Sequence, residues 1–249
     1  MCFDTDSEPP IPRIAGAAVS HDDLVLTAAD GSTFAAFLAA PDEPTKTGVV
    51  IYPDVRGLYH FYEELALRFA ERGHAACAFD YFGRTAGAAK RDDEFEYMPH
   101  VEQTTDAGVQ ADAAAAIAEL RSRGATAVFS IGFCFGGRAS WVAAASGLGL
   151  AGSIGFYGSP TRERGGPSVV DRAPQIACPI LALQAGDDQG ISADDNAAFE
   201  RALTAVGVEH EIVTFEGAPH SFFDRKQEDF AAASDDAWQR TLAFIARHS

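Results

Sequence analysis

The stretch that decides the fold is "AVFSIGFCFGG", residues 127–137. Its start is a short apolar run, as in a buried strand, and the "RASWVAAAS" that follows has the character of a helix. Cys134 stands between the two, flanked by Gly132 and Gly136 in the form G-x-nucleophile-x-G. Glycines at these places predict a sharp turn with no room for side chains beside the central residue. A cysteine there, at the positive end of a helix dipole that favours thiolate, is a candidate nucleophile.

Outward from this turn, strand-like and helix-like segments alternate along the chain. Short connections between them predict right-handed crossovers and a mostly parallel sheet with helices on both faces, an α/β fold. Around Asp30-Gly31, residues 24–41 predict a hairpin. Further strands are expected in 48–54, 75–83, 152–158, 178–188 and 210–220, and helices in 61–73, 104–124, 138–146, 193–206 and a last segment that carries Phe230, Trp238, Leu242 and Ile245.

The chain is predicted to form one domain over residues 21–249, preceded by an irregular arm over residues 1–20. Pro9, Pro10 and Pro12 block regular structure in the arm. The rest contains no internal repeat, no low-complexity linker and no break in composition. A chain of 249 residues with 47% hydrophobic content can fill a core of this size without metals or crosslinks.

Charge and cysteine usage exclude several classes of function. Nineteen basic and thirty-six acidic residues give a net charge of −17, which argues against nucleic acid and against an anionic membrane surface as partners. The four cysteines form no CxxC pair, which suits a reducing compartment. The acidic, proline-rich start is not a secretory signal, and the apolar runs are too short to span a bilayer. We therefore expect a cytoplasmic protein.

Three strand ends carry reactive side chains. Cys134 ends one strand, Asp187 and Asp188 end another, and His220 follows the Gly/Pro turn of "GAPHSFF". Ligands of open α/β sheets bind beyond the carboxyl ends of the strands, so these groups are expected to meet. Nucleophile, acid and histidine follow in the chain order used by α/β-hydrolases. The residues alone leave the choice between Asp187 and Asp188 open.

The other cysteines are better explained as structural residues. Cys77 and Cys178 lie within or beside apolar strands, and Cys2 lies on an end of the chain that we expect to be mobile. None of the three has a glycine turn around it.

Taken together, "GFCFGG", "GDDQGIS", "GAPHSFF" and "YPDVRGL" resemble the dienelactone hydrolases, the cysteine-dependent branch of the α/β-hydrolases, from about Asp30 to the last helix. The resemblance implies a triad of Cys134, Asp188 and His220, since the family's acid lies two residues after the glycine, here Gly186.

The same resemblance implies roles beside the triad. The amides of Phe135 and Val55 correspond to the family's oxyanion donors. Asp54 corresponds to an acid that hydrogen-bonds the thiol and helps its deprotonation, although the best-known members carry glutamate there. Arg56 departs from the family pattern and is interpreted as facing solvent. In the best-known members two arginines hold a substrate carboxylate, and the candidates here are Arg225, Arg91 and Arg84. Residues 84–100 are interpreted as a lid or a pocket wall.

The resulting hypothesis is a hydrolase that opens a lactone or cleaves an activated ester through an acyl-thioester, with a small-molecule substrate and with neither metal nor organic cofactor. A general carboxylesterase or thioesterase fits the same residues. The alternative classes are a non-catalytic binding protein on the same fold and, less well supported, a redox role for Cys134.

Overall fold

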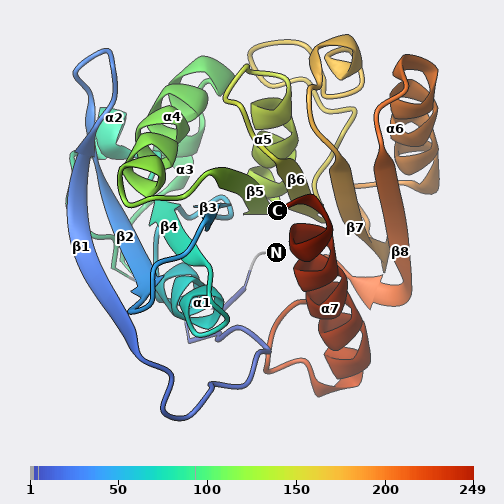
Figure 1. Ribbon diagram of the computed structural model, residues 1–249. Helices are drawn as coiled ribbons and strands as arrows, with labels where there is room; N and C mark the ends of the chain where they lie inside the picture. The colour runs from blue at the N-terminus through green and yellow to red at the C-terminus, as the bar shows by residue number, and fades with distance from the viewer. Residues whose placement is uncertain (1–2, 5, 93) are drawn as a thin grey trace.

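The computed structural model describes residues 3–4, 6–92 and 94–249, so the interpretation of Cys2 lies outside the described residues. Within these residues eight strands form one sheet, in the order β1-β2-β4-β3-β5-β6-β7-β8 (Figure 1). The two pairs β1–β2 and β2–β4 are antiparallel and all the others are parallel, as predicted. The strands are β1 (Val19–Thr27), β2 (Thr33–Pro41), β3 (Thr47–Tyr52), β4 (Ala75–Phe79), β5 (Ala127–Phe133), β6 (Gly152–Phe156), β7 (Ile180–Asp187) and β8 (His210–Pro219).

Helices cover both faces of the sheet. Figure 1 shows α1 and α7 on one face and α4, α5 and α6 on the other. The helices are α1 (His60–Ala70), α2 (Gly83–Ala86), α3 (Met98–Val101), α4 (Asp106–Ser122), α5 (Phe135–Ala144), α6 (Ala193–Val206) and α7 (Ala231–His248), with 3₁₀ turns η1 (Ala173–Gln175) and η2 (Glu228–Phe230). The predicted α/β-hydrolase architecture is confirmed. Among the described helices, none combines the length and apolarity needed to cross a bilayer.

Capping residues explain why the long helices begin where they do. Thr105 accepts a hydrogen bond from the amide of Gly108 at 3.1 Å and starts α4. Ser192 and Asp195 form a capping box at the start of α6, which ends at the left-handed Gly207. Each cap satisfies backbone groups that the helix itself cannot pair.

The core has two main layers because side chains on a strand alternate between faces. On β3, Val49 and Ile51 pack with the α1 and α7 side, whereas Val50 and Tyr52 pack with the α4 side. All four are fully buried, as expected for a central parallel strand with helices on both faces.

The start of the chain differs from its prediction. β1 begins at Val19, inside the segment expected to be irregular. The residues before it pack against the core, where Phe3 and Ile11 are buried. The ring of Phe3 stacks on that of Phe61, with ring centroids 4.1 Å apart. Proline excludes regular hydrogen bonding in this segment, but it does not prevent apolar side chains from docking.

Candidate active site

Cys134 lies on a sharp turn between β5 and α5, with a strained backbone of positive φ, at φ 55° and ψ −112°. Three neighbouring glycines make this turn sterically possible. A Cβ on Gly132 would lie 1.9 Å from the carbonyl oxygen of Gly136, and one on Gly136 would lie 2.1 Å from that of Tyr52. A Cβ on Gly137 would lie 2.5 Å from the carbonyl oxygen of Phe156. The turn therefore requires glycine at all three places, and it presents Cys134 at the start of a helix.

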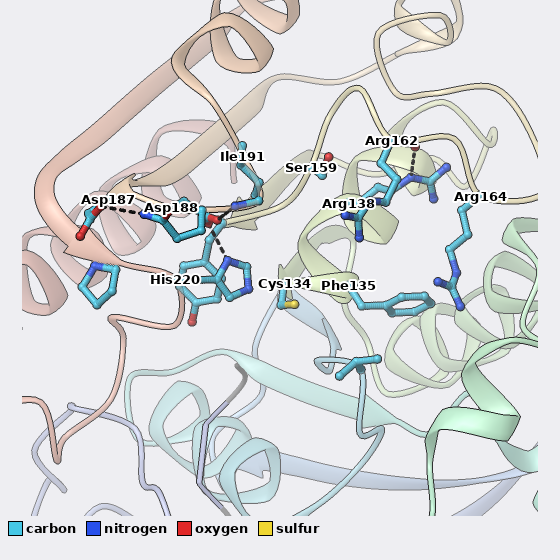
Figure 2. Close-up of a pocket in the computed structure, with 15 residues that line it drawn as sticks. Cys134, Phe135, Arg138, Ser159, Arg162, Arg164, Asp187, Asp188, Ile191 and His220 are labelled. Atoms are coloured by element: carbon cyan, nitrogen blue, oxygen red, sulfur yellow. Dashed lines mark hydrogen bonds and ion pairs between the residues drawn. The ribbon is translucent and has the colours of Figure 1, made fainter.

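The loops that follow β7 and β8 bring an acid and a histidine to this cysteine. Nδ1 of His220 lies 2.6 Å from Oδ2 of Asp188, and the side chain of His220 is also hydrogen-bonded to that of Cys134. Oδ1 of Asp188 accepts from the amide of Gly190 at 2.8 Å. Asp187 is exposed and accepts from the side chain of Gln189. The structure thus joins Asp188, and not Asp187, to His220 (Figure 2).

These contacts set the charges of the site. Burial alone would lower the pKa of His220, but the hydrogen bonds with Asp188 and Cys134 raise it to about 9. Burial would raise the pKa of Asp188, yet contact with His220 and the backbone amides holds it below its ordinary value. By contrast, burial raises the pKa of Cys77 and of Cys178 to about 12, so these two thiols stay protonated at neutral pH.

A cavity of about 520 Å³ opens above this group, and Cys134, Asp188 and His220 line it. Figure 2 shows Cys134 between His220 and Phe135. Phe135 and Val55 line the same cavity. Phe135 is the first residue of α5, so its amide has no carbonyl partner inside the helix. The cavity therefore holds a sulfur atom, an imidazole and the residues of the two expected oxyanion donors.

The buried carboxylate of Asp54 is paired with Arg56. Its Oδ1 accepts from the backbone amide of Arg56 at 2.8 Å, and its Oδ2 accepts from Nη2 of Arg56 at 3.1 Å and from the hydroxyl of Tyr59 at 3.2 Å. The interpretation of Arg56 as a solvent-facing residue is wrong, since only 15% of its side chain is exposed. Burial raises the pKa of Asp54 although Arg56 opposes the rise.

Comparison with known proteins agrees with this geometry. The sequence profile of the dienelactone hydrolase family matches residues 34–249. The chain belongs to the dienelactone hydrolase family. It is a hydrolase of the carboxylic ester class, as its sequence predicts.

Individual relatives cover nearly the whole chain. A Yersinia pestis protein named "Putative carboxymethylenebutenolidase" is 28% identical over 227 residues, which are 88% of this chain and 85% of that protein. A carboxymethylenebutenolidase of Rhodococcus opacus is 26% identical over 268 aligned residues, covering 100% of this chain and 97% of that protein. A Klebsiella pneumoniae structure titled as a putative dienelactone hydrolase superposes with a TM-score of 0.81 at 26% identity, over 92% of this chain and 99% of that one.

The three arginines predicted to hold a substrate carboxylate do not line the cavity of this hydrolase. Arg225 is exposed and paired with Glu8 at 2.6 Å. Arg91 is buried against Asp80 at 2.8 Å. The third, Arg84, joins Asp112 and Asp30. Each guanidinium is paired with a carboxylate outside this cavity, so the structure does not bring these three arginines to the site.

Three other arginines, Arg138, Arg162 and Arg164, line the cavity instead (Figure 2). Arg138 is paired with both carboxylate oxygens of Asp106, at 2.7 and 3.0 Å. Among the residues that the structure describes, no carboxylate pairs with Arg162 or Arg164. The sequence signal that could have identified them is their place in "SPTRER", residues 159–164, in the loop that follows strand β6 and so at the same sheet edge as Cys134.

Arg164 is held in a defined position. Its guanidinium lies 4.6 Å from the centroid of the Phe135 ring. Its Nη2 donates to the hydroxyl of Thr104 at 3.0 Å and to the carbonyl of Val101. Burial lowers the pKa of Arg164, but a guanidinium remains charged at any physiological pH. This leaves a fixed positive charge at the cavity wall, against the ring of Phe135.

Proposed function

We propose that this protein hydrolyses a lactone or an activated ester, with Cys134 as nucleophile, His220 as acid and base, and Asp188 as the acid that orients His220. The sulfur of Cys134 attacks the carbonyl carbon while the thiol proton resides on His220. The amides of Phe135 and Val55 hold the negative oxygen of the tetrahedral intermediate. The bond from carbon to the ring or alkoxy oxygen then breaks, and His220 gives that oxygen its proton. This leaves an acyl-thioester on Cys134.

Hydrolysis of the thioester completes the cycle. His220 takes a proton from water as the water oxygen attacks the thioester carbonyl, and the carbon–sulfur bond breaks to release the acid. The observation that carries the proposal is the hydrogen-bonded series Cys134–His220–Asp188 at a glycine turn that faces a cavity. A thiolate leaves readily and attacks amides poorly, so lactones, thioesters and activated esters are the expected substrates.

Charge at the cavity wall supports a substrate with an anionic group. Arg164, and the exposed Arg162 beside it, supply positive charge in a chain whose net charge is −17. A carboxylate on the acyl part of the substrate would meet them while its carbonyl lies at Cys134. Arg138 is excluded from this role because Asp106 already occupies it.

The ion pair between Asp54 and Arg56 opposes the proposed role of Asp54 in deprotonating the thiol of Cys134. The charge of Cys134 acts on Asp54, which supports their proximity. Arg56 and Tyr59 nevertheless engage its carboxylate, so a direct part in deprotonation requires this pairing to loosen. For the location of the protein, the free thiols of Cys77 and Cys178 support a reducing cytoplasm.

The first experiment is hydrolysis of p-nitrophenyl acetate and of a dienelactone by the wild type, by Cys134→Ala and by Cys178→Ala. We expect turnover by the wild type and by Cys178→Ala, whose lost thiol is buried away from the cavity, and none by Cys134→Ala. Mass spectrometry of a stopped reaction should find the acyl group on Cys134 alone.

Each other result has a definite meaning. Activity that survives in Cys134→Ala would refute the nucleophile. Ester turnover without lactone turnover would favour a general carboxylesterase or thioesterase. No turnover of either substrate and no acylation of Cys134 would favour the binding protein.

A further inference from the structure

Two consecutive peptide groups in the loop after β3 are held by tyrosine hydroxyls. The amide of Asp54 donates to the hydroxyl of Tyr62 at 2.8 Å. The hydroxyl of Tyr81 contacts the carbonyl oxygen of Pro53 at 2.6 Å and also that of Asp54. Both tyrosines are buried. The Pro53–Asp54 and Asp54–Val55 peptide groups together have two carbonyls and two amides. The tyrosine hydroxyls hold three of these four groups, and the fourth is the amide of Val55.

The geometry of the peptide bond decides where this fourth group points. The Asp54–Val55 peptide is trans, so its N–H and its C=O point in opposite directions. Val55 lines the cavity and Tyr81 is not among the described residues that do, so we infer that Tyr81 holds the carbonyl of Asp54 from the side away from the cavity. The amide of Val55 consequently faces the side on which Cys134 lies.

Tyr81 also reaches the second oxyanion donor. Its ring packs against the side chain of Phe135, with centroids 4.9 Å apart. On α5, a Cβ on Gly136 would lie 2.2 Å from the carbonyl oxygen of Pro53, so the two backbone segments that carry the donors are in close contact. A single buried side chain thus touches both halves of the expected oxyanion hole.

We propose that Tyr81 is a positioning residue for the oxyanion hole, because its hydroxyl orients the amide of Val55 and its ring supports Phe135. The inference rests on the proposed function and goes beyond it, since Tyr81 touches neither the reacting atoms nor the substrate. It stabilises the transition state by fixing donors in advance, which avoids reorganising them during the reaction.

The test compares two reactions of the same thiol in Tyr81→Phe. Acylation by p-nitrophenyl acetate, measured as the burst of p-nitrophenolate, needs an oxyanion hole. Alkylation of Cys134 by iodoacetamide proceeds through displacement of iodide and forms no oxyanion. We expect the acylation rate constant to fall by about tenfold or more, since one lost oxyanion donor costs still more, while the alkylation rate constant stays within about twofold of the wild type.

Tyr52→Phe is the matched control. It removes another buried tyrosine hydroxyl, one that bonds to Oε1 of Gln110 at 2.9 Å, and it should lose stability without losing acylation. Both variants are assayed at a temperature at which circular dichroism shows them folded. An unchanged acylation rate in Tyr81→Phe, or equal losses in acylation and alkylation, would overturn the role of Tyr81. Wild-type protein that is alkylated but never acylated would instead overturn the proposed function and the inference with it.

Discussion

The carboxylate of Asp188 accepts a hydrogen bond from Nδ1 of His220 across 2.6 Å, and this contact joins the loops that follow the neighbouring strands β7 and β8. Because these strands are parallel and adjacent, their carboxyl ends bring the two side chains together. Burial opposes a charged imidazole, but Asp188 and Cys134 raise the pKa of His220 to about 9. His220 is therefore protonated at neutral pH and ready to give a proton to a leaving oxygen.

This relationship predicts the pH dependence of the reaction. The pKa of His220 is raised above its ordinary 6.5, so the imidazolium persists through neutral pH and is lost as the pH rises through about 9. We expect ester hydrolysis to decline above that pH. Asp188→Asn removes the opposite charge, so the decline should move down by about 1 pH unit or more. The measurements are a pH–rate profile and an NMR titration of the His220 ring, with Asp187→Asn as control. An unmoved profile in Asp188→Asn would contradict this account.

The parts of the site that the sequence could predict are the local ones. The glycine turn at Cys134 is encoded by adjacent residues, and the alternation of strands and helices fixes which loops share an edge of the sheet. Asp187 and Asp188 are adjacent, and which of them turns toward His220 is set by the backbone where β7 ends, beside a shift in its register with β8 between Ala185 and Asp187. For this reason the residues alone left both acids open.

The ion-pair partners of the arginines could not be predicted from the sequence for a related reason. The partners of Arg84 are Asp30 and Asp112, and the partner of Arg225 is Glu8, more than 200 positions away in the chain. Whether an arginine is free to bind a substrate depends on such distant contacts, so its distance along the chain from a catalytic residue says little about its function.

A pair of arginine variants separates stability from substrate binding. Arg84→Met leaves the buried Asp112 without its partner, so we expect a loss of about 2 kcal/mol in the free energy of unfolding, allowing for solvent around Arg84, and an unchanged KM. Arg164→Met should raise the KM for mono-p-nitrophenyl succinate by about tenfold, as the loss of a charged hydrogen bond implies, with little effect on neutral p-nitrophenyl acetate.

Urea unfolding and steady-state kinetics of both variants give the comparison. Equal KM changes for the anionic and the neutral ester in Arg164→Met would refute an anion subsite. A raised KM in Arg84→Met would restore Arg84 as a substrate ligand.

The glycine turn makes a sharp prediction about packing. Gly136→Ala would put a Cβ 2.1 Å from the carbonyl oxygen of Tyr52 and 2.2 Å from that of Pro53, and both oxygens belong to the backbone. We expect a loss of about 3 kcal/mol or more in the free energy of unfolding, at the upper end of overpacking costs. Gly190→Ala is the control, because its Cβ would come no closer than 3.5 Å to the nearest contact. Urea unfolding of both variants measures the difference, and equal stabilities would show that the turn can relax.

The segment before β1 is expected to brace the loop that carries His220. The hydroxyl of Ser7 donates to Oδ2 of Asp224 at 2.8 Å, and both side chains are buried. Ser7→Ala leaves this carboxylate short of a donor, so we expect a loss of about 1–2 kcal/mol in the free energy of unfolding and faster amide hydrogen exchange in residues 221–227. Ser122→Ala, at an exposed position on α4, should change stability by less than about 0.5 kcal/mol. If exchange in 221–227 is unchanged in Ser7→Ala, the contact stabilises the arm alone and does not brace the His220 loop.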